Sequence, residues 1–227
     1  MWGGMNSSGT HRRLVVFFLL VLVVIAPAPF ASAGAAGTGA TITYRKIFKS
    51  SYPEFVELKV NDSGSGSYDI RQLSDESSPQ PMELDAEIVQ KIFDLAAKLH
   101  NFDGIELEMH RRIANLGEKT FRYDRGAETH QVKFNYTLDR SAEQLLQIFE
   151  TLARQQSDLF DLQRTMRYDR LGVNDVLRQI EKDYDANLLP EPQRFLASLD
   201  QLGADTHFID IARDRARALA ARIRSTH

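Results

Sequence analysis

The sequence of 227 residues contains no cysteine and a single tryptophan. Without a thiol the chain can form no disulfide and has no cysteine nucleophile, so a hydrophobic core must stabilise it unaided. An exported domain without disulfides is more typical of a bacterial envelope than of a eukaryotic secretory pathway. A basic excess is also missing, since the formal net charge is −3, and this argues against nucleic acid as a partner.

The common catalytic signatures are absent as well. The sequence has no Gly-x-Ser-x-Gly nucleophile elbow, no pair of histidines at metalloprotease spacing and no glycine-rich phosphate loop. These absences lead us to expect no cofactor and favour a binding function over catalysis.

The longest apolar run covers residues 14–26 and follows a basic segment that ends in Arg12 and Arg13. Its 13 residues suit the core of a secretory signal peptide and are too few for a helix that crosses about 30 Å of hydrocarbon. Small residues in the order Ala-Ser-Ala follow at 31–33, a pattern that signal peptidases accept. We therefore predict a signal peptide over residues 1–33.

Cleavage between Ala33 and Gly34 would leave 194 residues with 26 basic and 31 acidic side chains, a net charge of −5. Residues 34–40 are rich in glycine and alanine and are expected to form a flexible tether. No second apolar run follows, so we expect a processed protein without a membrane span, periplasmic or secreted. The alternative is that residues 1–33 remain attached as an N-terminal anchor.

Alternation of apolar and polar residues predicts an antiparallel sheet. The clearest hairpin turns at Arg125 and Gly126 and is rich in β-branched and aromatic residues. A weaker alternation at Ile105, Leu107 and Met109 predicts one further strand. The other predicted strands cover residues 41–48, 55–60, 68–73, 119–124 and 128–136.

Segments with helical periodicity lie between these strands and after them. Apolar residues recur three or four positions apart over residues 88–99, and Asp85 stands where an N-cap is expected. Ser141 and Gln144 have the spacing of a capping box, which predicts the start of a second helix. The order βββα-ββ(β)-α predicts an α+β domain with an antiparallel sheet over residues 41–155.

The last domain, residues 156–227, keeps an apolar period near 3.5 on both sides of Pro190. This period predicts two helices of about 30 residues that pack as an antiparallel hairpin. Gly172 and Gly203 are weak points, because glycine costs about 1 kcal/mol relative to alanine inside a helix. Asp169 falls on the apolar seam, where a buried carboxylate would need a partner such as an arginine.

Glu106, Glu108 and His110 are candidate metal ligands. If their segment is a strand, side chains two residues apart point to the same face, and two carboxylates with an imidazole could hold a divalent ion. The alternative, which we favour, is the solvated face of an amphipathic strand.

A basic series near the C-terminus includes Arg213, Arg217 and Arg224. These arginines could dock an acidic partner or anionic lipid headgroups. Alternatively, they complement the dipole of a helix C-terminus and pair with acidic residues one turn away.

The order of elements over residues 41–155 resembles that of the emfourin-type protein inhibitors of thermolysin-like metalloproteases. The resemblance implies an α+β fold and a protein-binding, protease-inhibitor role. It implies no individual site residue, because those inhibitors have a glycine-rich segment where this chain has residues 50–53. The segments that show the resemblance are 42–45, 53–60, 99–102 and 121–134.

Together these patterns predict an exported, non-catalytic binding protein whose partner is another protein. The whole chain is also similar to a family of exported bacterial proteins, a likeness that implies a location but no activity. Two alternatives stay open. One is an envelope enzyme that uses Glu106, Glu108 and His110, and the other is a structural protein that dimerises through its C-terminal helices.

Overall fold

The computed structural model describes residues 39–226. The predicted signal peptide and its cleavage site between Ala33 and Gly34 lie outside the described residues. Within residues 39–226, no helix combines the length and the apolar character that a membrane span requires.

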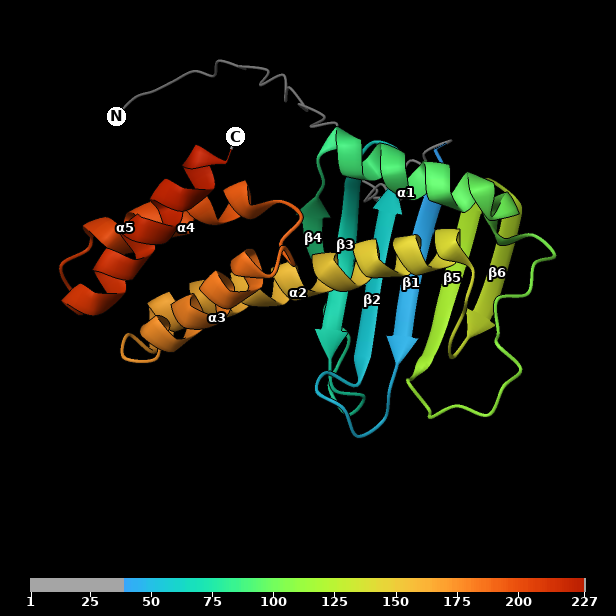
Figure 1. Ribbon diagram of the computed structural model, residues 1–227, viewed down its shortest axis with the longest axis horizontal. Helices are drawn as coiled ribbons and strands as arrows, with labels where there is room; N and C mark the ends of the chain where they lie inside the picture. The colour runs from blue at the N-terminus through green and yellow to red at the C-terminus, as the bar shows by residue number, and fades with distance from the viewer. Residues whose placement is uncertain (1–38, 227) are drawn as a thin grey trace, which may run out of the picture. The chain divides into compact units, whose positions relative to one another are not determined.

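Six antiparallel strands form one sheet in the order β4-β3-β2-β1-β5-β6 (Figure 1). Strands that are neighbours in sequence pair as hairpins, except β4 and β5, because β5 pairs with β1 instead. The strands are β1 Thr41–Ile47, β2 Phe55–Asn61, β3 Ser65–Arg71, β4 Gln80–Glu83, β5 Glu118–Arg125 and β6 Glu128–Phe134.

The two faces of the sheet differ because apolar and polar residues alternate along each strand. Tyr44 of β1 stands opposite Leu58 of β2 and Phe121 of β5, and all three side chains are fully buried. The next residue pair, Arg45 and Glu57, points to the other face. One face therefore carries the core and the other faces solvent, as is common in antiparallel sheets.

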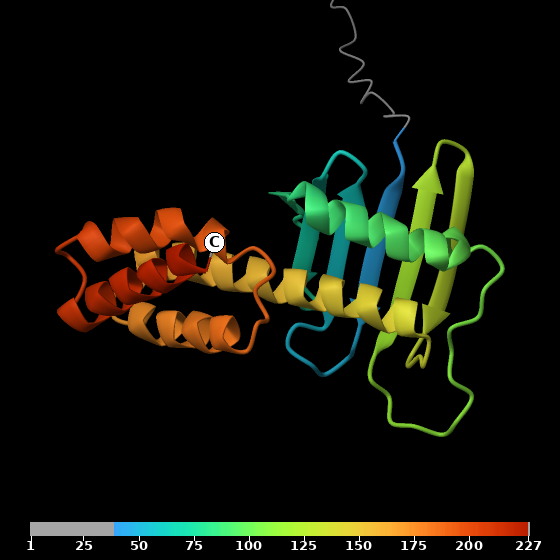
Figure 2. The same cartoon turned by 45° about the horizontal axis from the view of Figure 1, so that its top comes forward.

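Two helices cover the apolar face: α1 (Ala86–Lys98) and the first half of α2 (Arg140–Tyr168), as Figures 1 and 2 show. Ile92 of α1 and Phe149 of α2 are fully buried in the same core as the strand residues. The Phe149 ring stacks on Tyr44 with 5.3 Å between centroids, which fixes α2 over the centre of the sheet. The predicted α+β class and element order are confirmed.

A short 3-10 helix, η1 (His100–Phe102), follows α1, and the described helices after α2 form a bundle with its C-terminal half. Fully buried side chains from four helices build this second core, among them Leu162, Leu177, Leu199 and Leu219. Helices α4 and α5 lie side by side as the C-terminal hairpin. The elements are α3 Val173–Asp185, η2 Pro192–Phe195, α4 Leu196–Ala204 and α5 Asp210–Ser225.

Each of the two long helices expected in the last domain is broken once. The first break follows α2, where the Asp169 side chain accepts a hydrogen bond from the Gly172 N–H (3.0 Å). Asp169 is exposed, so the expectation of a buried seam carboxylate paired with an arginine is wrong. The second break follows Gly203, and there Asp205 accepts a hydrogen bond from the His207 N–H (2.9 Å). Side-chain bonds of this kind compete with helical backbone bonds.

α2 runs without interruption through the expected domain boundary at 155/156. Its residues up to Ala153 belong to the core under the sheet, and Leu162 is its first fully buried residue in the second core. One helix therefore contributes to both cores.

A buried carboxylate fastens the connection before α4 to the start of α1. Glu191 is fully buried and accepts hydrogen bonds from the Asp85 N–H (2.7 Å) and from Arg194 Nε (2.7 Å). The Gln155 side chain of α2 accepts a bond from the Glu191 N–H (2.8 Å). This charge is paired and hydrogen-bonded, which is the condition for burying it.

Four local expectations need correction. Ala40 was expected in the flexible tether but is buried, and its N–H donates to Asp62 (3.1 Å). Residues 105–109 are irregular, not a strand. β4 was not among the predicted strands, and its Pro81 is tolerated because β4 is an edge strand. α2 is capped by Asp139, which accepts from the Ala142 N–H (2.9 Å), and not by a Ser141 capping box.

Candidate functional site

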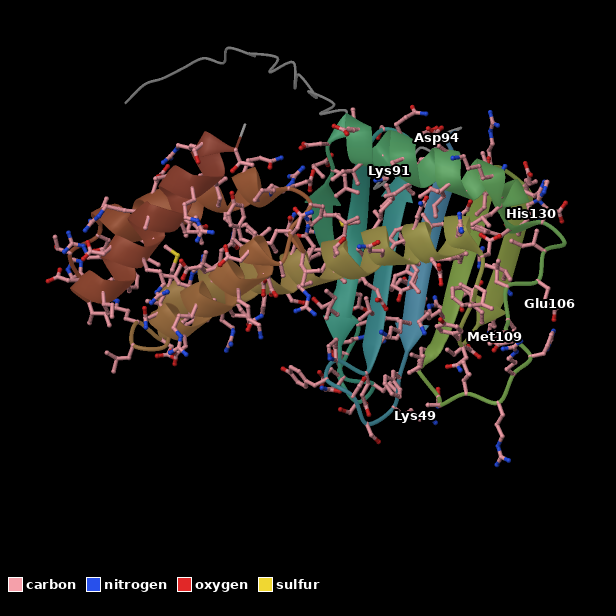
Figure 3. All side chains as sticks on the ribbon, in the orientation of Figure 1. Lys49, Lys91, Asp94, Glu106, Met109 and His130 are labelled. Carbon is pink, nitrogen blue, oxygen red and sulfur yellow. The ribbon has the colours of Figure 1, made fainter. Side chains whose placement is uncertain are left out.

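The three candidate metal ligands are separated by the irregular path of their segment. Glu106 and His110 form an exposed pair, with 3.0 Å between Oε1 and Nε2 and side chains 71% and 75% exposed. Glu108 turns away and accepts a hydrogen bond from the Asn135 backbone N–H. Figure 3 labels Glu106 and Met109 on this segment. In the part of the chain that the structure describes, no three His, Asp or Glu side chains are grouped so that they could hold a metal ion.

Two of the candidate docking arginines pair along their own helix. Arg213 donates to Asp210 (2.8 Å), three residues earlier in α5. Arg217 pairs with Asp214 in the same way and also donates to the carbonyl oxygen of Gly203 in α4 (2.6 Å).

The arginines nearer the C-terminus reach other helices. Arg224 donates to Asp200 of α4 (2.5 Å), and Arg222 donates to Glu181 of α3 (3.2 Å) and also pairs with Asp185. The basic series thus joins α5 to its neighbours, which leaves less positive charge for an external partner.

The open face of the sheet is a ladder of paired charges. Arg45 donates to Glu57 (2.6 Å) and Arg122 to Asp124 (2.7 Å). Hydrogen bonds from Arg122 lower the pKa of the Asp124 carboxyl, although its partial burial opposes this shift. This face has the features of an ordinary solvated sheet surface.

The β1–β2 loop (residues 48–54) presents an aromatic side chain on a fixed backbone. Tyr52 is 91% exposed. Around it, the Phe48 N–H donates to the carbonyl oxygen of Glu54 (2.8 Å), and the Ser51 hydroxyl lies 2.5 Å from the carbonyl oxygen of Phe48. The loop is therefore ordered by its own hydrogen bonds although its tyrosine packs on little.

A second loop, residues 103–117, enters β5 at the same end of the sheet and contains no helix or strand. Loops of this length without secondary structure are uncommon in compact domains and are often functional. Asn135, just after β6, holds it: its side chain donates to the Ala114 carbonyl (3.0 Å) and accepts from the Leu116 N–H (2.7 Å). With the bond from its backbone N–H to Glu108, Asn135 fastens this loop at three points.

Lys119 anchors the end of the same loop from inside the protein. Its amine lies within hydrogen-bonding distance of the carbonyl oxygens of Leu116 (3.2 Å), Gly117 (3.3 Å) and Asn135 (2.8 Å). Burial lowers the pKa of Lys119, and the positive charge of Lys46 adds to this shift. The amine is fully used by these carbonyls, so its role is structural.

The β3–β4 loop completes this end of the sheet, which is the lower end in Figure 1. The Leu73 N–H donates to the Glu54 side chain (3.3 Å), and Gly117 packs against Phe48 so closely that a Cβ would lie 2.8 Å from the Phe48 Cβ. Three loops thus meet here, and Figure 3 labels Lys49 of the β1–β2 loop at this end of the sheet. We call the exposed apolar residues of these loops the loop surface: Tyr52, Leu73, Ile113 and Leu116.

A depression of about 590 Å³ lies between the sheet and α2. Most of its charged lining is already paired, because Lys46 donates to Glu150 (2.9 Å) and Arg154 to Asp183 (3.3 Å). Burial and the nearby Glu150 carboxylate raise the pKa of Tyr44 well above its ordinary value. Among the described residues, Glu143 is the charged lining residue whose side chain has no hydrogen-bonded partner.

A second exposed apolar group lies at the far end of the bundle. The turn after α2 and the turn before α5 both lie at this end of the bundle (Figures 1 and 2). Tyr168 is 77% exposed. We call the exposed apolar residues of these two turns the bundle tip: Tyr168, Leu171, Ile209 and Ile211.

No family model matches this sequence, and no curated protein is significantly similar to it. The residues that stand out in the structure were not singled out by sequence patterns. Tyr52 has only one recognisable signal, an aromatic residue between serines and a proline where two strands are joined.

Proposed function

We propose that this protein is an exported, non-catalytic binding protein that recognises another protein through its loop surface. The observation that supports this most is Tyr52, which is 91% exposed on a loop held by internal hydrogen bonds. Tyrosine is among the residues that contribute most to protein interfaces, and a loop already fixed loses little conformational entropy on binding.

The surroundings of Tyr52 favour a protein partner over a small ligand. The loops at this end of the sheet also expose Leu73, Ile113 and Leu116, and Arg111 and Arg112, which precede Ile113 in sequence, are exposed as well. An apolar centre with a charged rim is the usual anatomy of a protein interface. The sharpest form of the proposal is a protease partner, as the element-order resemblance to metalloprotease inhibitors implies.

A photo-crosslinking amino acid at position 52 tests the proposal in the native envelope. We expect it to capture a defined protein, and the same group at position 160 is the matched control, since Phe160 is an exposed aromatic residue outside the loop surface and the bundle tip. With the captured protein purified, Tyr52→Ser should weaken binding about 10-fold or more, as expected for a central aromatic contact. Equal capture from both positions, or no effect of Tyr52→Ser, would contradict the proposal.

An enzyme that uses Glu106 and His110 is the competing proposal from another class. Only this exposed pair is available, because Glu108 is bound to Asn135. Near-stoichiometric zinc in the purified protein that is lost in His110→Ala would favour the enzyme.

The bundle tip supports a second candidate, self-association through the C-terminal helices. Leu171 and Tyr168, three positions apart at the end of α2, are both more than three-quarters exposed, and exposed apolar patches often mark interaction sites. Light scattering should then find a dimer that Leu171→Ser dissociates, while Tyr52→Ser leaves it intact. A monomer at all concentrations would exclude this candidate and leave the loop-surface proposal untouched.

A further inference from the structure

Two carboxyl groups meet where α3 packs on α2. Asp158 lies one helical turn after Arg154 on α2, and Arg154 donates to the almost fully buried Asp183 of α3, so both carboxyl groups lie at this helix contact. Asp183 accepts hydrogen bonds from Gln179 Nε2 (2.8 Å) and Arg154 Nη1 (3.3 Å). Asp158 Oδ2 is buried as well, but no donor among residues 39–226 reaches it.

Two ionised carboxylates in one partly buried helix contact repel each other, and a buried acceptor without a donor costs free energy. A single proton removes both penalties, because a protonated carboxyl donates a hydrogen bond to its ionised neighbour. We infer that the α2–α3 contact is a proton-binding site, in which Asp158 and Asp183 share one proton that stabilises the bundle.

The charges around the pair agree with this site. Burial, followed by the negative charge of Asp183 and a hydrogen bond with it, raises the pKa of Asp158 to about 7. Arg154 of α2 acts in the opposite direction and Asp161 of α2 in the same direction. Within the described chain, Asp183 on α3 and these two residues on α2 are the charges that act on Asp158.

The sign of the pH dependence follows from the raised pKa. In the unfolded chain Asp158 releases its proton near the ordinary value of 3.8, whereas in the folded protein it releases it near 7. Between these values the folded state binds more protons than the unfolded state, so the stability contributed by this site falls as the pH rises. Above about pH 7 the proton is lost from both states and the contribution stays at its minimum.

Asp158→Asn tests the site, because an asparagine amide donates to Asp183 at every pH. The melting temperature of this variant minus that of the wild type should grow by about 3–8 °C between pH 5 and pH 8.5. Asp175→Asn is the matched control, since Asp175 lies on α3 of the same bundle and pairs only with Arg178 at the surface (3.3 Å) among the described residues. Its difference from the wild type should not change with pH.

Carbon NMR of the Asp158 carboxyl gives a readout that does not depend on unfolding. In the wild-type protein the signal should titrate near pH 7, and in Asp183→Asn its midpoint should move at least one pH unit lower. A wild-type midpoint near 4, or an Asp158→Asn difference that is equal at pH 5 and pH 8.5, would overturn the inference. The outcome is independent of the loop surface and its partner.

Discussion

Lys119 is a single side chain on which much of the loop surface depends. Its amine is bonded to three carbonyl oxygens that come from the end of the 103–117 loop and from the residue after β6. Without the amine, these carbonyls would stay close together and partly buried without a donor. Such groups cost about 1–3 kcal/mol each when they are left unpaired.

We therefore expect Lys119→Met to lower the free energy of unfolding by about 2–4 kcal/mol, measured by urea denaturation at pH 7. Lys133→Met is the control, because Lys133 makes only an exposed ion pair with Glu118 (2.9 Å), a type worth about 0–1 kcal/mol. Similar losses in the two variants would mean that the carbonyl cluster does not depend on the amine.

At the scale of one helix, two residues are candidates for the N-cap of α2, Asp139 and Ser141. Asp139 makes the observed cap bond, with its side chain 2.9 Å from the Ala142 nitrogen. Asp139→Ala should destabilise the protein by about 1 kcal/mol, and Ser141→Ala should change stability by less than about 0.5 kcal/mol. A larger loss for Ser141→Ala, measured by thermal unfolding, would restore the capping box that the sequence suggested.

A second prediction at this scale concerns α3, which buries the side chains of one face in the second core and exposes those of the other face. Ile180 is fully buried in the second core, whereas Arg178 is exposed and bonded only to Asp175 of its own helix (3.3 Å). Ile180→Ala should cost about 2–4 kcal/mol through the cavity it leaves, and Arg178→Ala should cost less than about 0.5 kcal/mol. Chemical denaturation of both variants at one pH provides the comparison.

Sequence patterns predicted those elements whose burial has a simple period. Apolar and polar residues alternate in the predicted strands 41–48 and 55–60, and in the structure Ile42, Tyr44 and Leu58 are fully buried because one face of this antiparallel sheet is covered by helices. The same logic failed over residues 105–109, which contact the chain after β6 only through separate bonds, from the Met109 N–H to the Tyr136 carbonyl (2.9 Å) and from the Asn135 N–H to the Glu108 side chain, and form no strand ladder. The helix breaks after Asp169 and Gly203 depend on hydrogen bonds from backbone N–H groups to the side chains of Asp169 and Asp205. An apolar period of 3.5 residues carries no information about such bonds.

The candidate site was less accessible to prediction, because it depends on topology. Tyr52, Leu73 and Leu116 are up to 64 positions apart in the chain, and only the strand order brings their loops to one end of the sheet. The reverse error concerns Glu106, Glu108 and His110. Their close spacing in sequence suggested one site, but in the structure Glu108 bonds to Asn135 and only Glu106 and His110 pair. Spacing predicts proximity only within a regular element.

At the scale of the whole molecule, the signal peptide remains a prediction of the sequence. Mass spectrometry of the exported protein should find Gly34 as its N-terminal residue. Ala33→Leu should block processing because the peptidase pocket accepts only small side chains, while Ser32→Leu at the tolerant middle position should not. Intact Met1 in the membrane fraction of the wild type would instead identify a retained anchor.

Because α2 runs without a break through both cores, it couples the unfolding of one core to the unfolding of the other. If the bundle melts, α2 loses the packing around Leu162, and fraying from there reaches Phe149 under the sheet. A calorimeter should therefore record one heat-absorption peak, with equal van't Hoff and calorimetric enthalpies. Ser157→Pro breaks the helix between the two cores, and the single peak should then divide into two that melt at different temperatures.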